Sequence, residues 1–208
     1  MTEVHIGAIV EGHGECEAVP ILIRRIAQTI HPGLDPKVFH LRVPASKLMK
    51  EGELERAVTL AGRKLRGGGG IVVILDCDWP GGCPASDGPV LLERARAARG
   101  DMPVAVILAK MEFGAWFLAA AESLRGKRGL PVDLEAPADP EAIRGAKGWL
   151  SERMDGYSET TDQPALAAQF NLEAARTSDS FDKCFREIDR MLRQLLSEEQ
   201  ADTRAGTC

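Results

Sequence analysis

The chain has 208 residues, with 26 Lys and Arg against 31 Asp and Glu, which gives a net charge of −5 at neutral pH. This length fits one domain, or a domain with an appendage, and a hydrophobic fraction of 44% excludes a wholly disordered chain. No apolar run approaches the roughly 18–20 residues that cross a bilayer, and the amino terminus shows no secretory signal. We therefore expect a cytoplasmic protein that makes no use of a membrane.

Charge and cysteine content bear on two further classes of site without excluding nucleic-acid binding. A negative net charge is not typical of a nucleic-acid-binding surface, although an acidic site binds phosphate once divalent cations load it. The five cysteines are scattered, without a CxxC pair, so a structural zinc site is not expected. Free thiols in a reducing compartment fit this pattern best.

The first 124 residues alternate between strand and helix patterns. Apolar β-rich runs predict strands at 4–10, 38–43, 71–75 and 104–109. Amphipathic segments predict helices at 16–29, 54–65, 90–99 and 112–124, with a loop at 79–88. Because 71–75 consists of five branched aliphatic residues, we expect a strand buried on both faces, as in a parallel sheet. The fold class is therefore α/β, with a roughly four-stranded, mainly parallel sheet between helices.

The remainder of the chain shows no strand pattern. Residues 125–140 resemble a loop, and helical patterns follow at 141–154, 163–170 and 181–196. We predict an α/β core over 1–124, a helical extension over 125–208 that packs on it, and a disordered tail from about residue 197.

Acidic residues follow three of the four predicted strands. Glu11 follows the first strand, Asp76 and Asp78 the third, and Glu112 the fourth, while Glu15 lies one helical turn beyond Glu11. Ligands of open α/β sheets bind outside the carboxyl ends of the strands, and clustered carboxylates repel unless a hard cation such as Mg²⁺ joins them. Acids also occur after strands as helix caps and surface residues, so each one alone has an ordinary alternative.

These motifs resemble a known group of proteins. Residues 10–15 (Val-Glu-Gly-His-Gly-Glu) are similar to the EGxxE opening of Toprim domains, and Asp76-Cys77-Asp78 is similar to their DxD motif. The combination resembles the Toprim domains of the overcoming-lysogenization-defect (OLD) nucleases and, more closely, the bacterial DUF4276 family. The further segments that carry this resemblance are 111–118, Tyr157, Asp162-Gln163 and Ser180-Phe181.

The resemblance implies a Toprim/Rossmann-like fold and a role for each acid. It implies that Glu11 is a general acid/base or metal ligand, that Asp76 and Asp78 bind Mg²⁺ or Mn²⁺, and that Glu15 is a ligand for a second metal. Glu112 matches a later acid of the family and completes the expected metal ligands.

The activity implied is metal-assisted phosphodiester hydrolysis of DNA or RNA, in defence or repair. Lys110, two residues before Glu112, is expected to neutralise charge in the transition state. OLD nucleases carry a fused ATPase, whereas this sequence has no GxxxxGK[ST] loop, so the resemblance suggests a separately encoded ATPase partner. Two alternatives stay open: a non-catalytic regulatory or binding subunit of an ATPase complex, and a DxD phosphohydrolase with Asp76 as the nucleophile.

Four residues are candidates for contact with the substrate. Gly12 and His13 lie in the turn after the first strand, Arg24 lies on the following helix, and Trp116 follows Glu112 by one helical turn. Each has an ordinary alternative, which for Trp116 is packing in the core and for Arg24 is a solvated helix face. Cys77 is expected to be a small buried apolar residue that points away from the flanking aspartates.

Overall fold

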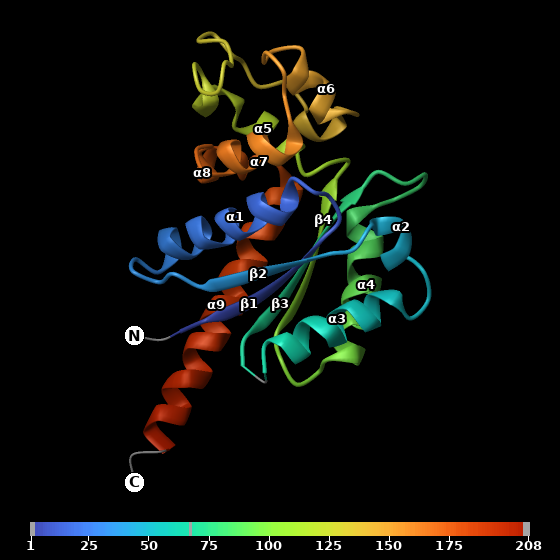
Figure 1. The fold of residues 1–208 in the computed structure, drawn as a ribbon, viewed down its shortest axis with the longest axis vertical. Helices are drawn as coiled ribbons and strands as arrows, with labels where there is room; N and C mark the ends of the chain where they lie inside the picture. Colours follow the sequence, from blue (N-terminus) through green and yellow to red (C-terminus); the bar gives the residue numbers. More distant parts are fainter. Residues whose placement is uncertain (1–2, 67, 206–208) are drawn as a thin grey trace.

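Four parallel strands form one sheet in the order β2-β1-β3-β4 in this computed structural model, which describes residues 3–66 and 68–205 (Figure 1). The strands are β1 His5–Val10, β2 Lys37–Arg42, β3 Gly70–Cys77 and β4 Val104–Lys110. The helices of the first half are α1 Glu15–Ile30, α2 Ala45–Leu48, α3 Glu53–Lys64 and α4 Pro84–Ala98. The predicted α/β fold with a parallel sheet between helices is confirmed.

The alternation of side chains along the strands builds two hydrophobic layers. On β3, Val72 and Ile74 join the larger buried cluster, whereas Val73 and Leu75 join the smaller cluster on the opposite face. Both sets are fully buried, because helices cover both faces of the sheet, as parallel sheets require. Cys77 is buried in the smaller cluster, as predicted.

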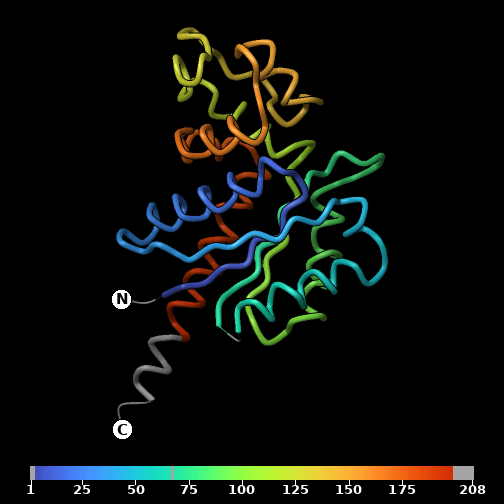
Figure 2. The backbone as a smooth tube through the Cα atoms, viewed as in Figure 1, coloured from blue at the N-terminus to red at the C-terminus, as the bar shows by residue number. Residues whose placement is uncertain are grey.

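The helices divide between the two faces. Helix α1 contacts β1 and β2, and the long helix α9 (Asp179–Ala205) contacts β3 and β4 on the same face, while α3 and α4 cover the other face (Figure 2). The carboxyl-terminal helix therefore completes the main layered structure. The sequence predicted that this helix ends at residue 196, but it extends to Ala205; residues 206–208 of the predicted disordered tail lie outside the described residues.

Short helices between β4 and α9 form a cap at the carboxyl end of the sheet (Figure 1). They are α5 Ala115–Ala119, η1 Ala121–Leu124, η2 Pro140–Ala142, α6 Ala146–Ser151, α7 Glu159–Ala167 and α8 Leu172–Ala175. An aromatic cluster joins this cap to the sheet, because the rings of Phe113, Phe117, Phe170 and Phe181 pack edge to face around Trp116 and one another.

Three helix predictions were wrong in detail. The predicted helix 112–124 is two short helices, and the predicted helix 141–154 is interrupted at Gly145, whose φ of 84° is left-handed. Helix α4 begins at Pro84, inside the predicted loop, because proline suits a first helical position and Asp87 accepts the backbone N–H of Cys83.

No helix in the described ranges is long and apolar enough to cross a bilayer.

Candidate functional site

Strand ends and the first turn of α1 bring Glu11, Glu15, Asp76 and Glu112 together at the carboxyl edge of the sheet. The Glu11 carboxylate reaches the backbone N–H of Asp76, with its Oε2 3.4 Å from that nitrogen. Because β1 and β3 are paired neighbours, their ends place residues 65 positions apart in contact. The sequence predicted that Glu11, Asp76 and Asp78 form one site. The structure brings Glu11 and Asp76 together with Glu15 and Glu112, a group of four that we call the acid cluster, whereas Asp78 is exposed beyond it.

Glu15 holds the turn after β1. Its Oε2 accepts the backbone N–H groups of Glu11 at 3.1 Å and Gly12 at 3.2 Å, and the side chain is only 4% exposed. A Cβ on Gly12 would lie 2.8 Å from Oε1 of Glu15, so glycine is needed there for the carboxylate to fold back. Glu15 thus has a structural function in addition to any role as a metal ligand.

A strained turn places Glu112. Met111 has a φ of 66°, which is rare for a residue with a side chain, and the Glu112 N–H donates to the Lys110 carbonyl at 3.0 Å across it. The chain reverses within these three residues, so the Phe113 N–H donates to Asp76 Oδ1 at 2.7 Å. Glu112 Oε1 accepts the Gly145 N–H at 2.8 Å, which ties the end of β4 to the cap.

Three carboxyl groups of the acid cluster, those of Glu11, Glu15 and Asp76, have raised pKa values. Burial, the charge of Glu15 and the charge of Asp78 together raise the pKa of Glu11 to about 7, with burial the largest cause. Burial followed by the charges of Glu15 and Glu11 raises the pKa of Asp76 well above its usual value, and burial raises that of Glu15. These shifts mean that the charged cluster lacks sufficient counter-charge from the protein.

One cation approaches the acid cluster from the cap. Lys147, on α6, lowers the pKa of both Glu11 and Glu15 through its charge and forms an ion pair with Glu159 of α7. The sequence analysis missed Lys147, because it lies more than thirty positions beyond the acids in chain order and carries no motif. Only the folding of α6 over the strand ends brings it near.

Buried polar atoms without partners surround the same edge. Glu112 Oε2, Tyr157 Oη and Gln163 Oε1 are buried without a hydrogen-bond partner among the described residues. Gln163 is packed so closely on Gly14 that a Cβ at that glycine would overlap Gln163 Oε1. Burial raises the pKa of Tyr157 to about 12, and the charge of Glu112 contributes to this rise. Unsatisfied buried groups are uncommon, and here one belongs to Glu112 of the acid cluster and two belong to residues of the cap beside it.

Several residues proposed from the sequence lie outside the acid cluster. Asp78 is exposed just beyond it, and His13 is exposed in the turn after β1. Lys110 is paired in register with Cys77, so the pleat directs it to the face opposite Asp76, where its Nζ lies 3.9 Å from Glu141.

Two proposed substrate contacts were wrong. Trp116 is fully buried and donates its indole N–H to Ser180 at 2.8 Å, so it packs in the aromatic cluster and cannot stack on a base. Arg24 pairs with Asp35 at 3.8 Å and lines a hollow with His5 and Lys64 near the amino end of the strands, away from the acids.

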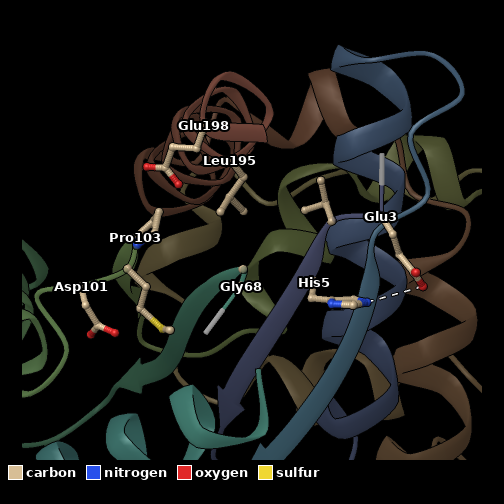
Figure 3. Close-up of a pocket in the computed structure, with 10 residues that line it drawn as sticks. Glu3, His5, Gly68, Asp101, Pro103, Leu195 and Glu198 are labelled. Atoms are coloured by element: carbon tan, nitrogen blue, oxygen red, sulfur yellow. Dashed lines mark ion pairs between the residues drawn. The ribbon is translucent and has the colours of Figure 1, made fainter. Parts of the chain in front are cut away.

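The opposite, amino edge of the sheet has a cavity of about 280 Å³ that also contains acids (Figure 3). There Glu3 pairs with His5 at 3.5 Å, and Asp101 accepts from Arg99 at 2.6 Å. The hydrogen bond from Arg99 holds the pKa of Asp101 below its usual value. Glu198 also lines this cavity and accepts a hydrogen bond from Gln194 at 2.9 Å, and it is exposed, whereas Glu15 and Asp76 at the carboxyl edge are buried and have raised pKa values.

The donor set of the acid cluster suits a hard divalent cation, although its side chains are not arranged as a complete metal site. In the described part of the chain, no three His, Cys, Asp or Glu side chains are grouped to hold a metal ion as they stand. Asp76, Glu15 and Glu112 each bind a backbone N–H through one oxygen. Their chemistry, the raised pKa values and the buried, unpartnered Glu112 Oε2 all fit Mg²⁺ or Mn²⁺.

Comparison with known proteins gives no match: no family model, no curated protein and no solved structure matches this chain.

Proposed function

We propose that the protein is a cytoplasmic, Toprim-like phosphodiester hydrolase of DNA or RNA that depends on Mg²⁺ or Mn²⁺. The observation that carries this proposal is the hydrogen bond from the Asp76 backbone N–H to the Glu11 carboxylate, which brings together two residues whose carboxyl pKa values are both raised by burial and by neighbouring negative charge. The resemblance to Toprim domains and to DUF4276, which rests on the order of the motifs that contain these two residues, supports the same proposal.

Glu11 and Asp76 would hold the cation, with Asp78 and Glu112 beside them. A bound divalent cation lowers the pKa of water and neutralises charge on a phosphate. The resemblance implies that Glu11 is either a ligand of the cation or a general acid/base, and as a general acid/base it would transfer the proton of the attacking water. Lys147 adds positive charge from the cap, in the role that the sequence analysis gave to Lys110.

The test is cleavage of plasmid, single-stranded DNA and RNA in Mn²⁺, Mg²⁺ or EDTA by the purified protein and two matched variants. We expect Asp76→Asn to reduce metal-dependent cleavage by about 1,000-fold or more, since it removes a ligand of the cation. Asp101→Asn, at the amino edge, is the control and should cleave normally. Equal activity of Asp76→Asn and the natural sequence would remove the catalytic assignment.

A second function is favoured by one observation. Glu15, Asp76 and Glu112 all bind backbone N–H groups, so the cluster also organises the strand ends. A regulatory or binding subunit of an ATPase complex would need the acids for this purpose alone. In that case Mn²⁺ binds without cleavage by the isolated chain, and activity appears only with the separately encoded ATPase.

A further inference from the structure

An arginine at the end of β2 lies beside the acid cluster without belonging to it. Arg42 is the last residue of β2, the strand next to β1, and it pairs in register with Val10 (Figure 1). Its Nη1 donates to the Glu11 carbonyl oxygen at 3.2 Å. The Glu11 carboxylate accepts the Asp76 N–H towards β3. Glu11 therefore lies between the guanidinium group and the end of β3.

Arg42 keeps its charge and most of its donors free. The side chain is exposed, and its bond to Glu11 is the only hydrogen bond that it makes in the described part of the chain. No carboxylate of the described residues lies within 4 Å of it, whereas lysines of the same edge pair with glutamates. Glu17 shares its surroundings, because both charges act on Cys16, but Glu17 is exposed and forms no ion pair with it. Since a guanidinium group has five N–H donors, the others are available to a ligand.

The position of Arg42 leaves the acids open to a cation. Its charge lowers the pKa of the Cys16 thiol, which places the guanidinium group near the first turn of α1. The cation that lowers the pKa of Glu11 and Glu15 is instead Lys147. Arg42 is therefore not the counter-charge of the carboxyl groups, and its own charge is not neutralised by them.

A guanidinium group beside a cation site is suited to phosphate. Its planar fork donates two parallel hydrogen bonds to the oxygens of one phosphate, whereas an ammonium group acts as a point charge. Because Arg42 and the proposed cation both contact Glu11, a phosphate next to the one on the cation comes within reach of the guanidinium group. Lys147 adds positive charge from the cap, so cations from two elements flank the acids.

We propose that Arg42 binds the phosphate that adjoins the scissile phosphodiester of the substrate strand, on the β2 side of the acid cluster. This inference rests on the proposed function and names a substrate contact of the same site. The adjoining phosphate has the same charge before and during the reaction. Its contact with Arg42 therefore stabilises the bound substrate and the transition state equally, and the effect of losing it falls on KM.

The first test is the steady-state kinetics of cleavage in Mn²⁺. We expect Arg42→Ala to raise KM roughly 5–20-fold and to leave kcat within about 2-fold, since a charge-assisted contact made in both states is lost. Arg42→Lys should recover only part of the loss, because it keeps the charge without the fork.

The second test measures binding alone. Fluorescence anisotropy gives the affinity of a labelled single-stranded oligonucleotide in Ca²⁺, which takes oxygen ligands as Mn²⁺ does. Arg42→Ala should weaken binding by the same factor as KM and lower the log–log salt slope by about 1. The control is Arg63→Ala, which removes an exposed arginine without an ion pair from the last turn of α3, at the amino edge of the sheet. It should behave as the natural sequence does.

Calorimetric titration with Mn²⁺ separates a phosphate contact from a merely structural role, and circular dichroism melting verifies that each variant is folded. The Mn²⁺ affinity of Arg42→Ala should equal that of the natural sequence. Weaker Mn²⁺ binding would overturn the proposal, because Arg42 would then only position Glu11, and so would unchanged KM and oligonucleotide affinity. Binding that depends on Arg42 in a protein that never cleaves would remove only the proposed hydrolysis. Absence of oligonucleotide binding by the natural sequence would remove both.

Discussion

The acids at the two edges of the sheet differ in burial, in pairing and in the direction of their pKa shifts. At the amino edge, Asp101 is exposed and paired with Arg99, and this hydrogen bond lowers its pKa. At the carboxyl edge, the Glu11 carboxylate accepts the Asp76 backbone N–H, burial raises the pKa of both carboxyl groups, and the cation that lowers the pKa of Glu11 is Lys147 of the cap. A carboxylate on the surface costs little free energy, because water solvates its charge. Burying several carboxylates together costs much more, because they lose that water and repel one another. Exposure and pairing are therefore typical of acids that only add charge to the surface, whereas burial in a cluster is typical of acids arranged for a cationic ligand.

Among single changes that test this difference between the edges, Lys147→Ala should have the largest effect on cleavage and on Mn²⁺ affinity. Removing the one cap cation that acts on Glu11 and Glu15 should lower metal-dependent cleavage by about 10–100-fold, through lost charge stabilisation of the phosphate. The same change should tighten Mn²⁺ binding by a few-fold, because the positive charge of Lys147 no longer repels the cation at the acids. Single-turnover kinetics and calorimetric titration measure the two quantities.

Lys127→Ala is the matched control, since Lys127 is a half-buried lysine just after η1 whose Nζ donates to the Gln169 carbonyl. Both measurements should be unchanged in this variant. Weaker Mn²⁺ binding by Lys147→Ala would contradict the assignment, because it would mean that Lys147 organises the ligands instead of opposing the cation.

Substitution of two glycines tests whether steric overlap at the two edges of the sheet affects Mn²⁺ binding differently. Gly14→Ala places a Cβ against Gln163 and the Glu159 carbonyl, and Gly69→Ala places one against the His5 carbonyl at a φ of 119°. Each should lower the free energy of unfolding by about 1–3 kcal/mol, as overpacking does. Urea unfolding measures this loss, and only Gly14→Ala should also weaken Mn²⁺ binding. Equal Mn²⁺ affinity in the two variants would show that the contact between the cap and α1 does not position the acids.

The smallest effect is on the pH dependence of stability without a cation. Glu11 has a pKa of about 7 in the folded chain against an ordinary value of 4.5, so the folded state binds the additional proton between these values. Its contribution is complete below pH 4.5 and is lost as the pH rises through 7. We expect about 1–2 kcal/mol after allowing for solvent screening of this partly exposed group, or several degrees in Tm.

Thermal melts in EDTA between pH 5 and pH 8 measure this change. The Tm of Glu11→Gln should change less with pH across this range than the Tm of the natural sequence. The change that remains is due to Asp76 and Glu15. Identical slopes would place the titration on those two residues alone.

The sequence was sufficient for the sheet and for most of the acid cluster, for a common reason. Buried strands such as β3 have continuous apolar sequences. Residues directly after such strands must lie at one edge of a parallel sheet. Glu11 and Asp76 could therefore be placed together before any coordinates were known.

The cap could not be predicted in the same way. Its helices are short, and their ends depend on left-handed residues and distant hydrogen bonds, such as the one from Gly145 to Glu112. Lys147 approaches the acids only through that arrangement. Trp116 and Lys110 were misassigned because position along the chain does not reveal the face to which a side chain points at the end of β4.

The left-handed backbone of Met111 has a consequence for opening of the cap. Relaxation of this residue to an extended backbone would withdraw the Phe113 amide from Asp76 and separate Glu112 from Gly145 in the same movement. Both hydrogen bonds therefore depend on one backbone conformation, so that a single dihedral angle joins the end of β4 to the cap and to the Asp76 carboxylate at once.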